Sequence, residues 1–293
     1  MADFDDRFAR NIALFGKKGQ QRLRAASAAV VGAGGLGSFV LMELALLGVG
    51  RLSPIDDEDL SNSNRNRFAG AWHDDPVPGS AKVDLAERHI HLIDPSINVG
   101  KVKASLFTEE AFAAVRAADY VIGCFDDDGP RLVLNELCAA YAKPLFDLAS
   151  DVPEPGVYGG RVCVAWDGTA CPYCLGEVDV KAAQRYLASD AERENEDAIY
   201  GVKRSVLGET GPSVVSINGV VASLAVTEFM AAVTGMRKPA MLVTYRGHES
   251  IVTKRREAPS PDCYYCKGLR GRGSEADVER YLRMPHLRGK RGS

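Results

Sequence analysis

The residues of this chain that could do chemistry begin with a set of glycines after a buried apolar run. Gly32, Gly34 and Gly37 have the spacing G-x-G-x-x-G, with Gly35 between them, and a helical run follows. Such spacing supplies a tight turn, close approach of the backbone to a phosphate and close packing of helix on strand. The helix N-terminus behind the loop offers free N–H groups and a positive dipole to an anion. The pattern predicts a phosphate-binding loop, although NAD-dependent dehydrogenases and plain tight turns share it.

Charged side chains along the chain could complete such a site. Asp56 ends the next apolar strand, about where an acid that binds ribose is expected. Arginine suits bidentate contact with phosphate, and lysine supplies a point charge. The basic residues best placed to converge on phosphate are Arg10, Arg67 and Lys82. Each of these residues alone could equally be a surface ion pair or a helix cap, so their joint presence carries the prediction.

Four cysteines form a second candidate site. Cys171 and Cys174 make one C-x-x-C pair, and Cys263 and Cys266 make another about ninety residues later. Four thiolates are the ligand set of a tetrahedral structural zinc ion. We expect this zinc to be structural, because four thiolates leave no open coordination position for catalysis.

The elements that must position these residues alternate between strand and helix as far as residue 146. Strands that alternate with helices predict an α/β fold with a mainly parallel, doubly wound sheet. Ligands of such sheets bind outside the carboxyl ends of the strands, where Gly32, Asp56 and Asp126 all fall. The expected strands end near residues 31, 55, 102, 124 and 146. The expected helices cover 39–47, 82–93 and 131–142, and a short helix begins at Thr108.

The pattern changes from about Val157. Residues 157–166 alternate like an antiparallel strand, and a long helix over 216–234 precedes a hairpin. The strongly charged stretch 177–210 is expected to be a mobile crossover segment. Two flanking segments complete the expected organisation: a helical arm over 1–25, and a basic tail over 267–293 that is interpreted as a solvated helix with a frayed end.

Composition limits the classes of function. The chain has 293 residues, a formal net charge of −3 and 46% hydrophobic residues, so nothing global points to nucleic acid or membrane. Glu43 interrupts the longest apolar candidate for a membrane helix. The N-terminus lacks a signal-peptide core, and seven cysteines without such a signal make a disulfide framework improbable. We therefore expect a cytoplasmic protein that needs neither nucleic acid nor membrane as a partner.

Taken together, the motifs resemble those of the ThiF/MoeB family, adenylating enzymes that are similar to the core of ubiquitin-activating enzymes. The resemblance extends from about Arg7 to Cys266, so residues 1–266 are expected to form a single adenylation domain. The two C-x-x-C pairs resemble that family's zinc site. The ordered blocks are Arg-Phe-Ala-Arg10-Asn, Gly32 to Gly37, Asp56-x-Glu58, Ser63-Asn64-x-Asn66-Arg67, Lys82 and Cys124-x-Asp126.

The resemblance implies a Rossmann-like fold and ATP as the ligand of the glycine loop. It implies that Arg67 and Asn64 hold the β- and γ-phosphates and that Lys82 reaches the α-phosphate. Asp56 would hold the ribose, with Glu58 nearby. These roles suit the chemistry, because attack of a carboxylate on the α-phosphorus passes through a transition state rich in negative charge.

The resemblance also implies a magnesium ion and a second subunit. Asp126 would bind Mg²⁺, together with oxygen atoms of the substrate. Asp127 and Asp128 follow it where the family usually has one acid and an asparagine, so which acid meets the metal is left open. Arg10 resembles the arginine that the family donates across a homodimer interface to its partner's ATP.

The implied reaction is adenylation of the C-terminal carboxylate of a ubiquitin-like or sulfur-carrier protein. The alternative is adenylation of a precursor peptide in natural-product maturation. Transfer-RNA-modifying dehydratases of the same superfamily are disfavoured by the cysteine pairs. An NAD-dependent oxidoreductase would need neither Arg67 nor Lys82, and a catalytically dead binding module would leave those cations without a phosphate partner.

One departure from the family concerns the acceptor of the activated acyl group. Several relatives carry a cysteine in the crossover segment that accepts the acyl group as a thioester, but the stretch from Ser205 to Val214 has none. Cys124, Cys138 and Cys163 lie in strand or helix patterns and are expected to be buried and inert. The sequence therefore predicts an acyl-adenylate that waits for an external acceptor such as a persulfide donor.

Overall fold

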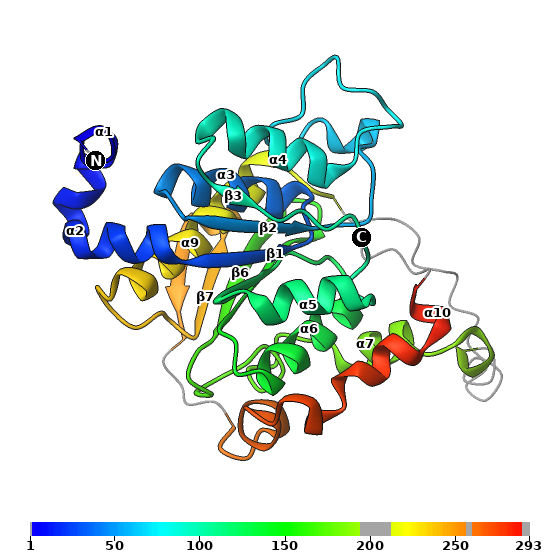
Figure 1. Cartoon of the computed structure of the whole chain (residues 1–293). Coiled ribbons are helices and arrows are strands. Elements are labelled where there is room, and N and C mark those ends of the chain that lie inside the picture. The colour runs from blue at the N-terminus through cyan, green and yellow to red at the C-terminus, as the bar shows by residue number, and fades with distance from the viewer. Residues whose placement is uncertain (1, 194–211, 256–259, 289–293) are drawn as a thin grey trace.

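The computed structural model describes residues 2–193, 212–255 and 260–288. Within these residues eight strands form one sheet in the order β3-β2-β1-β4-β5-β6-β7-β8 (Figure 1). Neighbours from β3 to β5 are parallel, and β6, β7 and β8 are added antiparallel. This confirms the predicted fold class. The strands are β1 Ser27–Val31, β2 Arg51–Ile55, β3 Asn98–Val99, β4 Tyr120–Gly123, β5 Leu145–Glu154, β6 Val157–Ala165, β7 Leu242–Arg246 and β8 Ile251–Lys254.

Helices cover both faces of this sheet, because residues of each central strand point alternately to either side. Ala28 and Val30 of β1 join the hydrophobic core that includes α3 and α9, while Ala29 and Val31 join the core that includes α5 and α6. The helices are α1 Ala2–Arg7, α2 Ala9–Ala25, α3 Gly35–Leu47, α4 Lys82–Ile93, α5 Glu109–Ala117, α6 Asp128–Ala140, α7 Val180–Leu187, α9 Val215–Thr234 and α10 Pro285–Arg288. Shorter turns of helix are η1 Asn62–Asn64, η2 Gly247–Glu249, η3 Tyr264–Leu269, η4 Gly273–Ala276 and η5 Val278–Arg283.

The helix α9 is long and apolar enough to cross a membrane by length and composition alone. It was not among the apolar candidates identified from the sequence. Its apolar stretch is 61% buried inside the fold, where it packs against α3 and α2. The hydropathy of α9 is therefore explained by its place as a core helix.

The prediction of a solvated C-terminal helix is wrong for the described part of that tail. Residues 267–288 return across α6 as short turns of helix (Figure 1). Leu269, Val278 and Leu287 are buried in the same hydrophobic core as α6, and Arg280 pairs with the buried Glu136 at 2.6 Å. The prediction considered only the basic residues of the tail. The apolar residues between them decide how the tail packs on α6.

The predicted crossover segment has two parts in the structure. Its first part forms α7, with Ala183 buried against α6, so residues 180–187 are a packed helix. Residues 194–210 lie outside the described residues. The contact at Gly129 shows how closely α7 approaches, since a Cβ at Gly129 would lie 2.3 Å from the ring of Tyr186.

Candidate active site

The glycine loop brings the end of β1, the end of β4 and the start of α3 into direct contact. Gly32 has a φ of +90°, and a Cβ there would lie 2.7 Å from the carbonyl oxygen of Cys124. A Cβ at Gly37 would lie 1.9 Å from the carbonyl oxygen of Gly32. Neither position tolerates a side chain, so these two glycines are required by backbone packing.

Three side chains from distant parts of the sequence meet the other two glycines. A Cβ at Gly34 would lie 4.0 Å from Nζ of Lys82. A Cβ at Gly35 would lie 3.2 Å from Cδ of Arg67 and 2.6 Å from Nδ2 of Asn218. The fold therefore brings Lys82 and Arg67 to the glycine loop, as a phosphate site requires.

Asn218 is a site residue that sequence reasoning missed. It is 1% exposed, and its Nδ2 donates a hydrogen bond to Oγ of Ser213 at 3.0 Å. Its Oδ1 is buried and makes no hydrogen bond within the described residues. The available signal was a lone amide near the start of the mainly apolar helix α9, where a buried polar group needs a partner.

Lys82 begins α4 and is only 5% exposed. Its ammonium group forms an ion pair with the carboxylate of Glu58, and its backbone N–H donates to the carbonyl oxygen of Glu58 at 3.0 Å. A buried lysine costs free energy unless it is paired. Glu58 thus holds this cation next to the loop until an anionic ligand competes for it.

Two carboxyl groups at the carboxyl ends of β2 and β4 have raised pKa values. Asp56 accepts hydrogen bonds from the N–H groups of Ala33 at 2.7 Å and Glu58 at 2.9 Å. Burial raises the pKa of Asp56 to about 6, despite the opposing charge of Lys82. The side chain of Asp126 is exposed to solvent on one side. Burial by the surrounding protein, followed by the negative charge of Asp127, raises its pKa to about 6.

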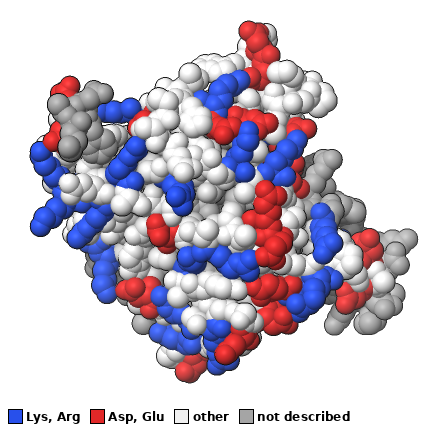
Figure 2. Space-filling view, in the orientation of Figure 1, with Lys and Arg blue, Asp and Glu red and all other residues white. Residues whose placement is uncertain are grey.

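These carboxylates fit a divalent cation. The charges of Glu58 and Lys82 both act on Asp126, so the three groups share one edge of the sheet. Figure 2 shows a band of Asp and Glu side chains that starts near the arrowheads of β1 and β2 in Figure 1. Carboxylates that repel one another are stabilised by Mg²⁺, which binds through one or two of them and substrate phosphates. The chemistry of these residues therefore fits a divalent cation together with substrate phosphates.

Two predicted site residues are placed away from the glycine loop. Oδ1 of Asn64 accepts the N–H of Ser61 at 3.2 Å and caps η1, one turn before Arg67. Arg10 is exposed on α2, two residues after Phe8, whose ring packs against Gly48 beyond the far end of α3. The 13 residues of α3 span about 20 Å, so Arg10 lies far from the glycine loop of its own chain.

The four predicted zinc ligands converge. The Sγ atoms of Cys171, Cys174, Cys263 and Cys266 lie within 4.8 Å of one another. The Sγ–Sγ distance is 3.6 Å for Cys171 and Cys263, and 3.9 Å for Cys174 and Cys266. Tetrahedral zinc with Zn–S bonds of about 2.3 Å implies Sγ–Sγ distances of about 3.8 Å. The cluster could therefore hold zinc.

The remaining cysteines are poor nucleophiles. Cys138 and Cys163 are buried as predicted, whereas Cys124 is only partly buried. Burial raises the pKa of all three thiols, which disfavours the reactive thiolate. Most of the crossover stretch without a cysteine, residues 205–211, lies outside the described residues.

This chain is similar to several known proteins. A maize protein named adenylyltransferase and sulfurtransferase MOCS3-1 is 29% identical over 96% of this chain, which spans 55% of that protein. The molybdopterin-synthase adenylyltransferase of Escherichia coli is 29% identical over 91% of this chain and 99% of its own length. In structure, Escherichia coli MccB matches 89% of this chain and 72% of its own with a TM-score of 0.71 at 20% identity.

The family model named ThiF family matches residues 8–265. The match therefore includes the glycine loop, the cations, the carboxylates and three of the four cysteines of the cluster, and it ends just before the C-terminal segment that packs on α6. The chain belongs to the ThiF family, the family of adenylating enzymes that its motifs resemble.

Proposed function

We propose that this chain uses ATP to adenylate the C-terminal carboxylate of a ubiquitin-like or sulfur-carrier protein, with residues 1–266 as one adenylation domain. The observation that carries the proposal is the convergence of Lys82 and Arg67 on Gly34 and Gly35. An NAD site does not need two cations at this loop, whereas the greater negative charge of a triphosphate favours them.

In the proposed reaction a carboxylate oxygen of the substrate attacks the α-phosphorus of ATP, and pyrophosphate leaves. The products are an acyl-adenylate and pyrophosphate. Lys82 leaves Glu58 to meet the α-phosphate, Arg67 with Asn64 holds the β- and γ-phosphates, and Asp56 binds the ribose. Mg²⁺ held by Asp126 supplies charge neutralisation at the phosphates.

The structure offers one surface suited to the proposed homodimer. Phe39 of α3 with Val215, Val220 and Leu224 of α9 lines an open apolar groove that begins next to the glycine loop. Val215 is 44% exposed and Val220 is 36% exposed. In the proposed dimer the two-fold axis runs through this groove, perpendicular to α3, and the α3 helices of the two copies are antiparallel. The end of α3 near Arg10 then faces the partner's glycine loop, which supports donation of Arg10 in trans.

The reaction is proposed to stop at the adenylate. Activated acyl groups need a thiolate or an external acceptor, and the three cysteines outside the cluster have raised pKa values. A persulfide donor or an amine would attack the bound adenylate. The alternative substrate, a precursor peptide, uses the same carboxylate chemistry, so the exchange assay below is run with a Gly-Gly-ending carrier protein and with free peptides.

Asp126→Asn tests the proposed reaction through ATP–pyrophosphate exchange that depends on the carboxylate substrate. We expect exchange to fall by at least about 100-fold, because several kcal/mol of transition-state stabilisation depend on the metal. Asp127→Asn is the matched control and should retain exchange. In the wild type, protonation of Asp126 competes with Mg²⁺, so the Mg²⁺ concentration for half-maximal exchange should rise as pH falls through about 6. Full exchange in Asp126→Asn would refute the assignment.

Mixed variants test whether Arg10 acts in trans. Arg10→Ala and Arg67→Ala homodimers should each be inactive, and mixing them should restore about a quarter of wild-type exchange, because heterodimers keep one intact site. Arg67→Ala mixed with Lys82→Ala is the control, since both changes affect one site and no intact site forms. A mixture of Arg10→Ala and Arg67→Ala that stays inactive after subunit exchange would show that Arg10 is not donated by a partner.

Elemental analysis tests the proposal that the cysteine cluster binds structural zinc. We expect one zinc ion per chain, and Cys263→Ser should lose it and lower the melting temperature. Zinc contributes on the order of 10 kcal/mol to the folding of small zinc peptides, so the effect should be large. Cys138→Ser, a buried cysteine outside the cluster, should keep its zinc. Protein that is free of zinc and equally stable would contradict a structural metal.

A non-reducing gel with labelled substrate and ATP tests whether the reaction stops at the adenylate. We expect no covalent adduct on this chain while exchange continues, because buried thiols with raised pKa values are weak nucleophiles. A thiol-sensitive adduct that disappears in Cys124→Ala or Cys163→Ala would instead make this a thioester-forming enzyme.

A further inference from the structure

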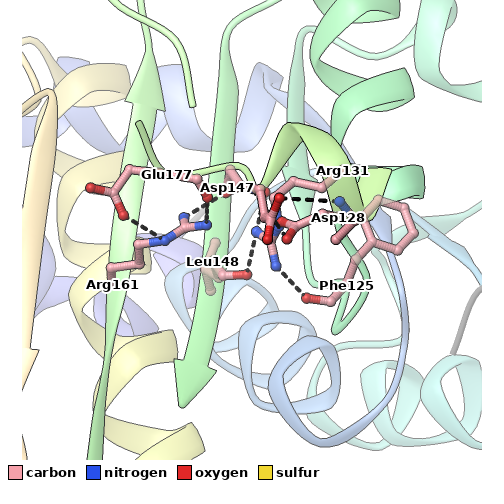
Figure 3. Close-up of polar contacts among 9 residues, drawn as sticks. Phe125, Asp128, Arg131, Asp147, Leu148, Arg161 and Glu177 are labelled. Carbon is pink, nitrogen blue, oxygen red and sulfur yellow. Dashed lines mark hydrogen bonds and ion pairs between the residues drawn. The ribbon is translucent and has the colours of Figure 1, made fainter. Parts of the chain in front are cut away.

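A buried network of ion pairs lies beside the proposed magnesium carboxylate, and neither the motifs nor the proposed reaction accounts for it (Figure 3). Its centre is Arg131 in the first turns of α6, whose side chain is 3% exposed. Arg131 pairs with Asp147 of β5 at 2.5 Å, and Arg161 of β6 pairs with the other oxygen of Asp147 at 2.7 Å. Arg161 is held in turn by Glu177 at 2.9 Å.

Arg131 also contacts the residues on both sides of Asp126, the backbone of Phe125 and the side chain of Asp128. Its Nη2 donates to the carbonyl oxygen of Phe125 at 2.6 Å, and its Nε lies 3.4 Å from the carboxylate of Asp128. The Phe125 carbonyl shares a rigid peptide plane with the N–H and Cα of Asp126, so fixing that oxygen also fixes the backbone position from which the Asp126 carboxylate extends. Figure 3 shows the guanidinium reaching from α6 to the Phe125 carbonyl.

Asp126 needs such support because the regular structure stops on either side of it. The N–H of Cys124 donates to the carbonyl oxygen of Val31 at 2.8 Å, and this is the hydrogen bond by which β1 holds the end of β4. Helix α6 begins at Asp128. A charge-assisted hydrogen bond from Arg131 therefore stabilises a short irregular segment between strand and helix.

We infer that Arg131 is a positioning residue that orients Asp126 toward the divalent cation, with the carboxylate of Asp147 neutralising the charge of Arg131. The inference rests on the proposed function, in which Asp126 binds Mg²⁺. Partners that orient a metal ligand typically change metal affinity by about 10- to 100-fold when they are removed. Arginine suits this position because its planar fork reaches Asp147 and the Phe125 carbonyl together, which one ammonium group cannot do.

Arg161 provides the matched control. It shares Asp147 with Arg131 and is also largely buried, but within the described residues its hydrogen bonds and ion pairs are to Asp147 and Glu177 and not to residues 125–128. If the network only connects β5, β6 and α6, Arg131→Lys and Arg161→Lys should lower stability to similar degrees and leave metal binding unchanged. If Arg131 positions Asp126, only Arg131→Lys should weaken metal binding.

The experiment measures Mn²⁺ binding by paramagnetic resonance, with a non-hydrolysable ATP analogue bound to the full chain and the melting temperature recorded in parallel. We expect Arg131→Lys to weaken Mn²⁺ binding by about 10-fold and Arg161→Lys by less than about 2-fold, at similar melting temperatures. Equal Mn²⁺ affinity in wild type, Arg131→Lys and Arg161→Lys would overturn the inference.

Two further outcomes are decisive. If Arg131→Lys does not fold, Asp147→Asn replaces it, because this change loosens Arg131 without altering residues 125–128. Unchanged Mn²⁺ affinity in Asp147→Asn would overturn the inference. Wild-type protein that binds the analogue but no Mn²⁺, and shows no exchange, would instead overturn the proposed function, so the two failures are distinguishable.

Discussion

The site depends on one close approach of backbone to backbone, where the turn after β1 passes the end of β4. Gly32 and the carbonyl group of Cys124 leave no room for a Cβ between them, and Gly37 packs just as tightly on Gly32. Asp126 follows Cys124 by two residues, so this contact also sets the distance between the glycine loop and the proposed magnesium carboxylate. The distance between the glycine loop and Asp126 therefore depends on the absence of a Cβ atom at Gly32.

Several charged side chains that are costly to bury lie around this contact, and each is already paired in the absence of a ligand. Lys82 lies on Glu58, and Asp56 accepts two backbone N–H groups. Arg131 and Arg161 divide the two oxygens of Asp147 between them. In the proposed reaction only the ion pair next to the loop exchanges partners, because Lys82 lies beside the glycine loop whereas Asp147 is 1% exposed. Paired charges of similar chemistry thus serve binding in one place and rigidity in the other.

Local patterns were enough to predict most of the framework. Alternation of strand and helix, the glycine spacing and the cysteine pairs each lie within short stretches, so the sheet, the loop and the cysteine cluster were predictable. Asn218, Arg131 and Arg161 were not, because their roles depend on contacts that only the folded chain creates. The basic tail was misinterpreted for a related reason, since its charges were counted and its spaced apolar residues were not.

That tail also links late and early parts of the polypeptide. Nε2 of His286 lies 2.8 Å from the carbonyl oxygen of Leu187, at the end of α7. Val278 and Leu287 complete the core that β1 and α6 begin. During synthesis, therefore, the apolar face of α5 and α6 leaves the ribosome long before the segment that covers it. A nascent chain that pauses at that stage exposes an apolar helical surface to which chaperones can bind. A chain that terminates there keeps this surface exposed and is prone to aggregate.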